Sequence, residues 1–90
     1  KQMKLAAIVE DKESGRRMTV YTDQPAVQFY TANFLTGVDG KNGAKNNYRG
    51  GLCLETQNYP DAPNKPLFPS CVLRPGDLYH YTTEYRFDII

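Results

Sequence analysis

The residue with the clearest potential for chemistry is Glu55, which lies in an alternating stretch at 52–57. Apolar and polar side chains take turns there, which predicts a short β-strand whose polar face carries Cys53, Glu55 and Gln57. The turn-forming residues at 58–61 end this strand directly. A carboxylate flanked by a thiol and an amide would be partly desolvated and aimed, as a general base requires. Most glutamates on strands are solvated or ion-paired, so the pattern alone leaves a structural role open.

A second candidate is Gln28, within residues 22–33. Asp23 before Pro25 resembles a capped helix start, and the apolar residues that follow fit a helical stripe. The same residues also alternate as in a strand, and their aromatic and β-branched content favours the strand. On that strand Gln28 and Tyr30 would face the same way, an amide beside a phenol. The structural alternative is a core Tyr30 with a satisfied hydroxyl and a surface Gln28.

Composition predicts an all-β fold for the elements that position these residues. The 90 residues include seven tyrosines, four phenylalanines, six prolines and no tryptophan, which favours strands and turns over helices. Residues 4–10 and 16–22 predict an antiparallel hairpin closed by a charged turn that ends in glycine. Residues 70–73 predict a short strand. The alternation over 78–90 predicts the clearest strand of the chain, with His80 on its polar face.

Two intervening stretches predict loops. Residues 36–51 hold five glycines among Asp, Asn and Lys, and we expect a long exposed loop there without strand or helix. Its glycines suggest a phosphate cradle only weakly, because no Gly-Lys-Ser/Thr ending follows. Residues 58–69 contain four prolines, which predict a stiff loop.

Charge and cysteine content exclude several classes of protein. The net charge is +1 and the eleven basic residues are scattered, so no nucleic-acid partner is expected. Cys53 and Cys71 form no metal-binding spacing with the single histidine, so we expect reduced cysteines and no metal. The apolar run at 5–9 is too short for a signal peptide, and no segment reaches the length of a membrane span. We therefore expect a cytoplasmic protein with no membrane partner.

The start of the chain indicates a piece of something longer. It begins Lys1-Gln2-Met3, and strand-like patterning follows at Lys4 with almost no lead-in. A chain of this length buries only about 60 to 65 per cent of its unfolded surface, which leaves little margin for independent stability.

Several sequence motifs occur in the same order as in one protein family. They are Pro25-Ala-Val-Gln-Phe-Tyr-Thr-Ala-Asn-Phe-Leu35, Gly40-Lys-Asn-Gly43, Gly51-Leu-Cys-Leu-Glu-Thr-Gln-Asn-Tyr-Pro-Asp-Ala62 with Asn64, Phe68-Pro69 and Leu73-Arg-Pro-Gly76. From about Val20 to Phe87, the chain resembles the C-terminal quarter of the aldose 1-epimerase (galactose mutarotase) family.

This resemblance implies a large antiparallel β-sandwich, of which residues 1–90 would be the C-terminal segment of a single domain. It also implies a cofactor-free enzyme with a sugar-binding cleft, which interconverts the α and β anomers of free hexoses such as galactose and glucose. The family's catalytic base is the glutamate of the Leu-Glu-Thr-Gln motif, here Glu55. Gln28, in the Val-Gln-Phe-Tyr motif, matches a glutamine that contacts the sugar.

The chain also departs from the family pattern. The general-acid histidine, a second substrate histidine, and the arginine and aspartate that bind sugar hydroxyls belong to segments upstream of this chain. The rest of the fold, covalent or as a separate chain, would therefore be a required partner. Where members often carry a histidine near the C-terminus, this sequence has Tyr81, and no role passes to the neighbouring His80. Two alternatives stay open: a hexose-6-phosphate 1-epimerase, for which Arg49 is the nearby cation, and a non-catalytic sugar-binding or regulatory β-sandwich.

Overall fold

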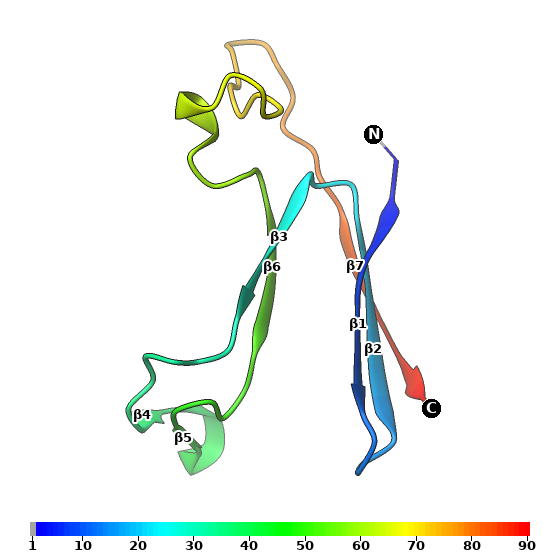
Figure 1. The fold of residues 1–90 in the computed structure, drawn as a ribbon, viewed down its shortest axis with the longest axis vertical. Helices are drawn as coiled ribbons and strands as arrows, with labels where there is room; N and C mark the ends of the chain where they lie inside the picture. The colour runs from blue at the N-terminus through cyan, green and yellow to red at the C-terminus, as the bar shows by residue number, and fades with distance from the viewer. Residues whose placement is uncertain (1) are drawn as a thin grey trace.

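The computed structural model describes residues 2–90, so the expectation that rests on Lys1 lies outside the described residues. The chain is all-β and its sheets are antiparallel, as predicted. One sheet has three strands, and a second sheet stands beside it with two (Figure 1). No helix among residues 2–90 has the length and apolar character that crossing a membrane requires.

The three-stranded sheet has the order β1-β2-β7, with β1 at Lys4–Asp11, β2 at Arg16–Thr22 and β7 at Thr83–Ile89. The predicted hairpin of β1 and β2 is confirmed. Its turn closes through Gly15, whose φ of +76° is in the region that glycine adopts without a steric penalty. The amide of Gly15 donates to the carbonyl of Asp11 at 2.8 Å. The last strand, β7, pairs with β2 although sixty residues separate the end of β2 from the start of β7.

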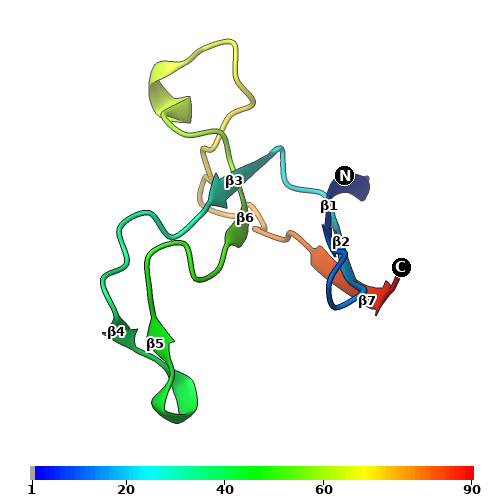
Figure 2. The same ribbon diagram turned by 60° about the horizontal axis from the view of Figure 1, so that its bottom comes forward.

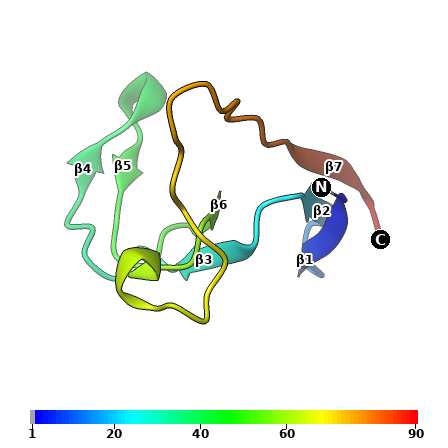
Figure 3. The same cartoon turned by 90° about the horizontal axis from the view of Figure 1, so that it is seen from above.

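The second sheet pairs β3 (Ala26–Tyr30) with β6 (Cys53–Gln57). Residues 26–30 are therefore a strand, and the helical alternative for 22–33 is wrong. Only Asp23, Gln24 and Pro25 separate β2 from β3, so the two sheets adjoin at this connection and diverge away from it (Figure 1). The long segment that follows β6 crosses back to the start of β7 (Figure 3).

The expectation of a glycine-rich loop without regular structure is wrong in part. A minimal hairpin projects from the β3–β6 sheet and consists of β4 (Val38–Asp39), the 3-10 turn η1 (Lys41–Gly43) and β5 (Lys45–Asn46) (Figure 2). The amide of Gly40 donates to the carbonyl of Ala44 at 2.7 Å, and Gly43 has a φ of +77°. Glycine at these positions lets the chain reverse within a few residues.

Two other sequence-based predictions are corrected. Residues 70–73 form no strand, because the amide of Val72 bonds locally to the Ser70 hydroxyl at 3.1 Å instead of to a neighbouring strand. The strand predicted from residue 78 begins only at Thr83. The amide of Thr82 donates to the Asp23 carboxylate at 2.8 Å, so its backbone is engaged with the β2–β3 turn and not with a ladder. A single 3-10 turn, η2 (Ala62–Asn64), interrupts the proline-rich loop.

The described chain has very little core of its own. Its buried hydrophobic residues are Val20, Ala32 and Ala62, and of these only Val20 is fully buried. The radius of gyration is 16.4 Å, whereas a compact domain of this length has about 12 Å. The accessible surface is 7336 Å², about 2,000 Å² more than the size scaling gives for a compact monomer of this mass. Both values describe an open arrangement of sheets that lacks a shared interior.

Candidate active site

The two candidate residues of the sequence lie directly opposite one another. In the antiparallel ladder of β3 and β6, Gln28 is the register partner of Glu55. Directly paired residues project to the same face of a sheet, with Cβ atoms about 4.5 to 5.5 Å apart. The structure therefore brings together an amide and a carboxylate that are separated by 26 intervening residues in the sequence.

Local chain geometry explains why these strands pair in this register. Pro25 precedes β3, where its missing N–H costs no ladder bond. Just beyond β3, Ala32 has a φ of +61°, which turns the chain out of the strand. Its carbonyl accepts a hydrogen bond from the amide of Arg49 at 3.1 Å, and the Arg49 guanidinium donates to the Asn33 side chain at 3.0 Å. These contacts clamp the two chain ends that lead from β3 and into β6.

The neighbours of the pair complete a mixed polar face. Tyr30 is the register partner of Cys53, and Ala26 is the partner of Gln57, so all four share the face of Gln28 and Glu55. Tyr30 is half-buried and its hydroxyl accepts a hydrogen bond from the amide of Phe34 at 3.4 Å. The satisfied Tyr30 hydroxyl and the exposed Gln28 agree with the structural alternative considered from the sequence, but Tyr30 is half-buried and is not a core residue.

Glu55 is more exposed than its sequence neighbours suggested. The thiol and amide beside it were expected to desolvate the carboxylate, but both Glu55 and Cys53 are exposed in this chain. The other face of β6 is better covered, since Leu54 and Thr56 are half-buried. The carboxylate can accept a proton or hydrogen bonds, and the opposite amide can both donate and accept. An open sheet face presents both groups side by side.

The remaining candidate groups do not join this face. His80 lies in the segment that precedes β7, outside the ladder, so the predicted alternation does not assign it a sheet face. Cys53 and Cys71 are free thiols. Among residues 2–90, no group of three His, Cys, Asp or Glu side chains is placed to hold a metal ion.

A bidentate ion pair lies on the other sheet. The Arg17 guanidinium donates two hydrogen bonds to the Asp88 carboxylate, at 2.8 and 2.6 Å, and Glu10 lies 3.6 Å away. The hydrogen bond from Arg17 holds the pKa of Asp88 below its usual value, and Asp88 in turn raises the pKa of Arg17. Arg17 and Asp88 are register partners across β2 and β7. They stabilise that sheet and take no part in the face that carries Glu55.

A cluster of three threonine hydroxyls was not predicted from the sequence. The hydroxyls of Thr22, Thr56 and Thr83 meet where the two sheets adjoin. Threonines so far apart in sequence carry no local signal, because only the tertiary arrangement of β2, β6 and β7 brings them together.

Comparison with known proteins agrees with the motifs of this face. A family model described as Aldose 1-epimerase matches residues 1–86. The chain is 53% identical over 90 residues to the galactose mutarotase of Mus musculus and 52% identical to that of Homo sapiens, in each case over 99% of this chain and 26% of the relative. It is 42% identical over 86 residues to the aldose 1-epimerase of Escherichia coli K12, over 93% of this chain and 25% of that protein. The chain thus spans about a quarter of the length of these relatives. The family match over nearly all of its length shows that the chain belongs to the aldose 1-epimerase family.

Proposed function

We propose that residues 1–90 are the C-terminal segment of an aldose 1-epimerase that interconverts the α and β anomers of free hexoses such as galactose and glucose. Glu55 is the general base of the reaction and Gln28 binds the sugar. The observation that carries this proposal is the register of β3 and β6, which pairs Gln28 with Glu55. A base and a sugar-binding amide must reach one pyranose, and adjacent positions on one sheet face meet that requirement.

The chemistry needs two groups that move protons. Glu55 takes the proton of the anomeric hydroxyl while an acid delivers a proton to the ring oxygen. The bond between C1 and the ring oxygen then breaks and leaves an open-chain aldehyde. After rotation about the bond between C1 and C2, the ring oxygen attacks the opposite face of C1, and both protons return. Each positioned proton-transfer group contributes on the order of 100- to 10,000-fold to the rate.

The acid in this proposal is a histidine on a part of the protein outside residues 1–90. His80, the single histidine of the chain, lies outside the β3–β6 ladder and takes no role in the reaction. The remainder of the fold would also cover the open face of β3–β6, and so remove the carboxylate from bulk water. The approximately 2,000 Å² of surface in excess of a compact monomer supports such a partner, whether covalent or a separate chain.

The two alternatives have less support. A hexose 6-phosphate would need free cations at the rim of the site, but the Arg49 guanidinium donates to Asn33 and lies 5.1 Å from the centroid of the Tyr48 ring. A non-catalytic sugar-binding protein can use the same carboxylate as a hydrogen-bond acceptor for sugar hydroxyls, and what favours the enzyme is membership of the aldose 1-epimerase family.

Polarimetry on the full-length protein separates these functions. Fresh α-galactose and α-glucose are each mixed with enzyme, and the approach to anomeric equilibrium is compared with buffer alone. We expect acceleration with both free sugars and little with their 6-phosphates. Acceleration of the phosphates alone would favour the first alternative. Sugar binding by calorimetry without any acceleration would favour the second.

A further inference from the structure

Three threonine side chains link the two sheets through their hydroxyls. Thr22 ends β2 and Thr83 begins β7, and the two are register partners whose Oγ1 atoms lie 3.2 Å apart. Thr56 reaches the same point from β6, with its Oγ1 2.7 Å from that of Thr83. A direct hydrogen bond therefore joins a strand of the two-stranded sheet to a strand of the three-stranded sheet.

The three threonine hydroxyls form a chain of hydrogen bonds. Its donor-to-acceptor direction can be assigned, because each threonine hydroxyl has one proton to donate. Thr22 donates its proton to the carbonyl of Thr82 at 2.9 Å. At the contact with Thr83, Thr22 must therefore accept and Thr83 must donate. The Thr83 proton is then committed, so Thr56 is the donor in the 2.7 Å contact. The hydrogen bonds run from Thr56 through Thr83 and Thr22 to a backbone carbonyl.

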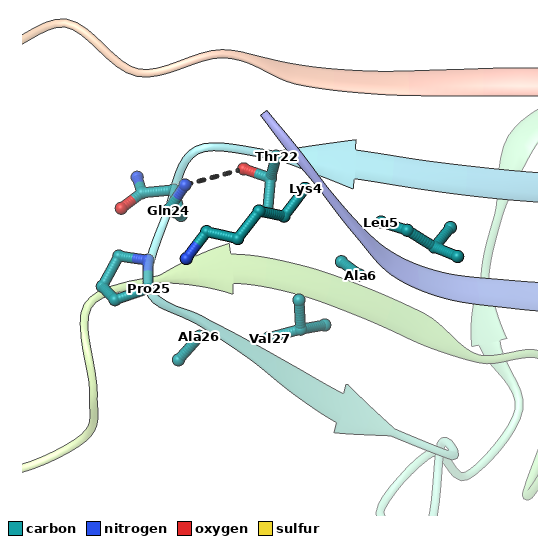
Figure 4. Close-up of a pocket in the computed structure, with 8 residues that line it drawn as sticks. All are labelled: Lys4, Leu5, Ala6, Thr22, Gln24, Pro25, Ala26 and Val27. Atoms are coloured by element: carbon teal, nitrogen blue, oxygen red, sulfur yellow. Dashed lines mark hydrogen bonds between the residues drawn. The ribbon is translucent and has the colours of Figure 1, made fainter. Parts of the chain in front are cut away.

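At the Thr22 end of this hydrogen-bond chain, further hydrogen bonds fix the hydroxyl in place. The Thr22 hydroxyl also accepts a hydrogen bond from the backbone amide of Gln24 at 3.1 Å, drawn as a dashed line in Figure 4, so both of its lone pairs are used. Thr22 is only 3% exposed, which keeps water from competing for these bonds. The amide and carbonyl of Thr82 are tied to the β2–β3 turn, the amide through Asp23 and the carbonyl through Thr22.

The donor end of the hydrogen-bond chain, Thr56, is the sequence neighbour of the proposed base, Glu55. Thr56 directly follows Glu55 on β6, and successive side chains of a strand point to opposite faces. The Thr56 hydroxyl therefore forms its hydrogen bond on one face of β6, while the Glu55 side chain projects from the opposite face. Within residues 2–90, β6 has five residues and β3 is its ladder partner, so the Thr56 hydrogen bond adds a restraint from the three-stranded sheet.

We infer that the Thr56–Thr83–Thr22 chain is a positioning device that fixes the orientation of Glu55. This inference rests on the proposed function, because it assigns the device to the base of that reaction. The inference assigns the three threonines no contact with the sugar, since Thr56 points to the face opposite Glu55. They act through the backbone of β6, and a displacement of about 1 Å at a reacting group is enough to cost up to about 100-fold in rate.

The test compares Thr56→Val and Thr56→Ser in the full-length protein. Valine keeps the shape of threonine without the hydroxyl, whereas serine keeps the hydroxyl. We expect Thr56→Val to lower kcat for galactose about 10-fold with KM changed less than about threefold, since proton transfer depends on distance more steeply than binding does. Thr56→Ser, which keeps the hydroxyl, should have a kcat within about twofold of the parent value. Thr19→Val, a half-buried threonine of β2 outside the chain of hydroxyls, is the matched control and should leave kcat unchanged.

A second pair of variants, at Thr83, keeps the test valid if one of the Thr56 variants misfolds. Thr83→Val breaks the chain at its middle, and Thr83→Ser keeps it. Because one broken link already releases β6, the double variant Thr56→Val/Thr83→Val should be no slower than about twice the slower single variant. A lower melting temperature with unchanged kcat in both valine variants would overturn the inference and show that the threonines serve stability alone. In that event the proposed function still stands if the parent protein mutarotates galactose, whereas a parent that does not do so overturns the proposed function itself.

Discussion

The pairing of Gln28 with Glu55 makes a charge-swap experiment possible. Gln28→Glu is nearly isosteric and places a second carboxylate opposite the first one. Two unit charges about 5 Å apart repel by about 1 kcal/mol in water and by about 3 kcal/mol at an effective dielectric constant of 20. Because both side chains are exposed here, the lower figure applies to this chain. If the remainder of the protein covers the face, the cost rises toward the higher figure.

Urea unfolding of the full-length protein at pH 7 measures this cost. We expect Gln28→Glu to be less stable than the parent by about 1 to 3 kcal/mol, with the deficit reduced in high salt. The double variant Gln28→Glu/Glu55→Gln has only one carboxylate and should recover the parental stability. It should not recover activity, because the carboxylate now lies on the neighbouring strand, about 4.8 Å from its original place. If the swap fails to restore stability that Gln28→Glu has lost, or if Gln28→Glu loses none, the two side chains do not face one another.

Two further predictions concern the chain as a whole and its second sheet. The isolated 90 residues should show no cooperative unfolding and no mutarotation, since they have almost no buried core; circular dichroism with polarimetry checks this, and acceleration above buffer would mean that the chain needs no acid from elsewhere. Asp88→Asn in the full-length protein should lower the free energy of unfolding at pH 7, because the pKa of Asp88 is depressed in the folded state by its hydrogen bond from Arg17. The sign follows from linkage: the stabilisation is complete above the unfolded value of about 3.9 and is lost as the pH falls through the lower folded pKa. Urea unfolding across pH should therefore show the two proteins converging below about pH 4, and a deficit that is constant with pH would contradict this assignment.

Period-two alternation, together with the aromatic and β-branched content of residues 22–33, predicted the strands that carry the candidate site. It assigned Gln28 and Glu55 to polar faces of strands within residues 22–33 and at 52–57, and the structure has strands at 26–30 and 53–57. Alternation within one strand contains no information about its partner, so the direct pairing of the two residues could not be predicted. That register depends on the turn at Ala32 and on its bond to Arg49, which join segments far apart in sequence.

The errors of the sequence analysis also have tertiary causes. Residues 78–82 alternate like a strand, but Asp23 and Thr22 bind the backbone of Thr82 and delay the start of β7. The expected desolvation of Glu55 assumed that its immediate neighbours would cover it. Burial of a sheet face depends on what packs across it, and within residues 2–90 no other layer covers this face. The threonine hydroxyl chain lay beyond any local pattern for the same reason.

The central claim is that the carboxylate of Glu55 removes a proton from the anomeric hydroxyl. Glu55→Gln keeps the shape of the side chain and removes its basicity, and Glu13→Gln, at an exposed position of the β1–β2 turn, is a matched control. Polarimetry with galactose on the full-length variants should show a loss in kcat of at least about 100-fold for Glu55→Gln, with unchanged thermal stability and no loss for the control. A Glu55→Gln protein that mutarotates galactose within about twofold of the parental rate would contradict the assignment of Glu55 as the base.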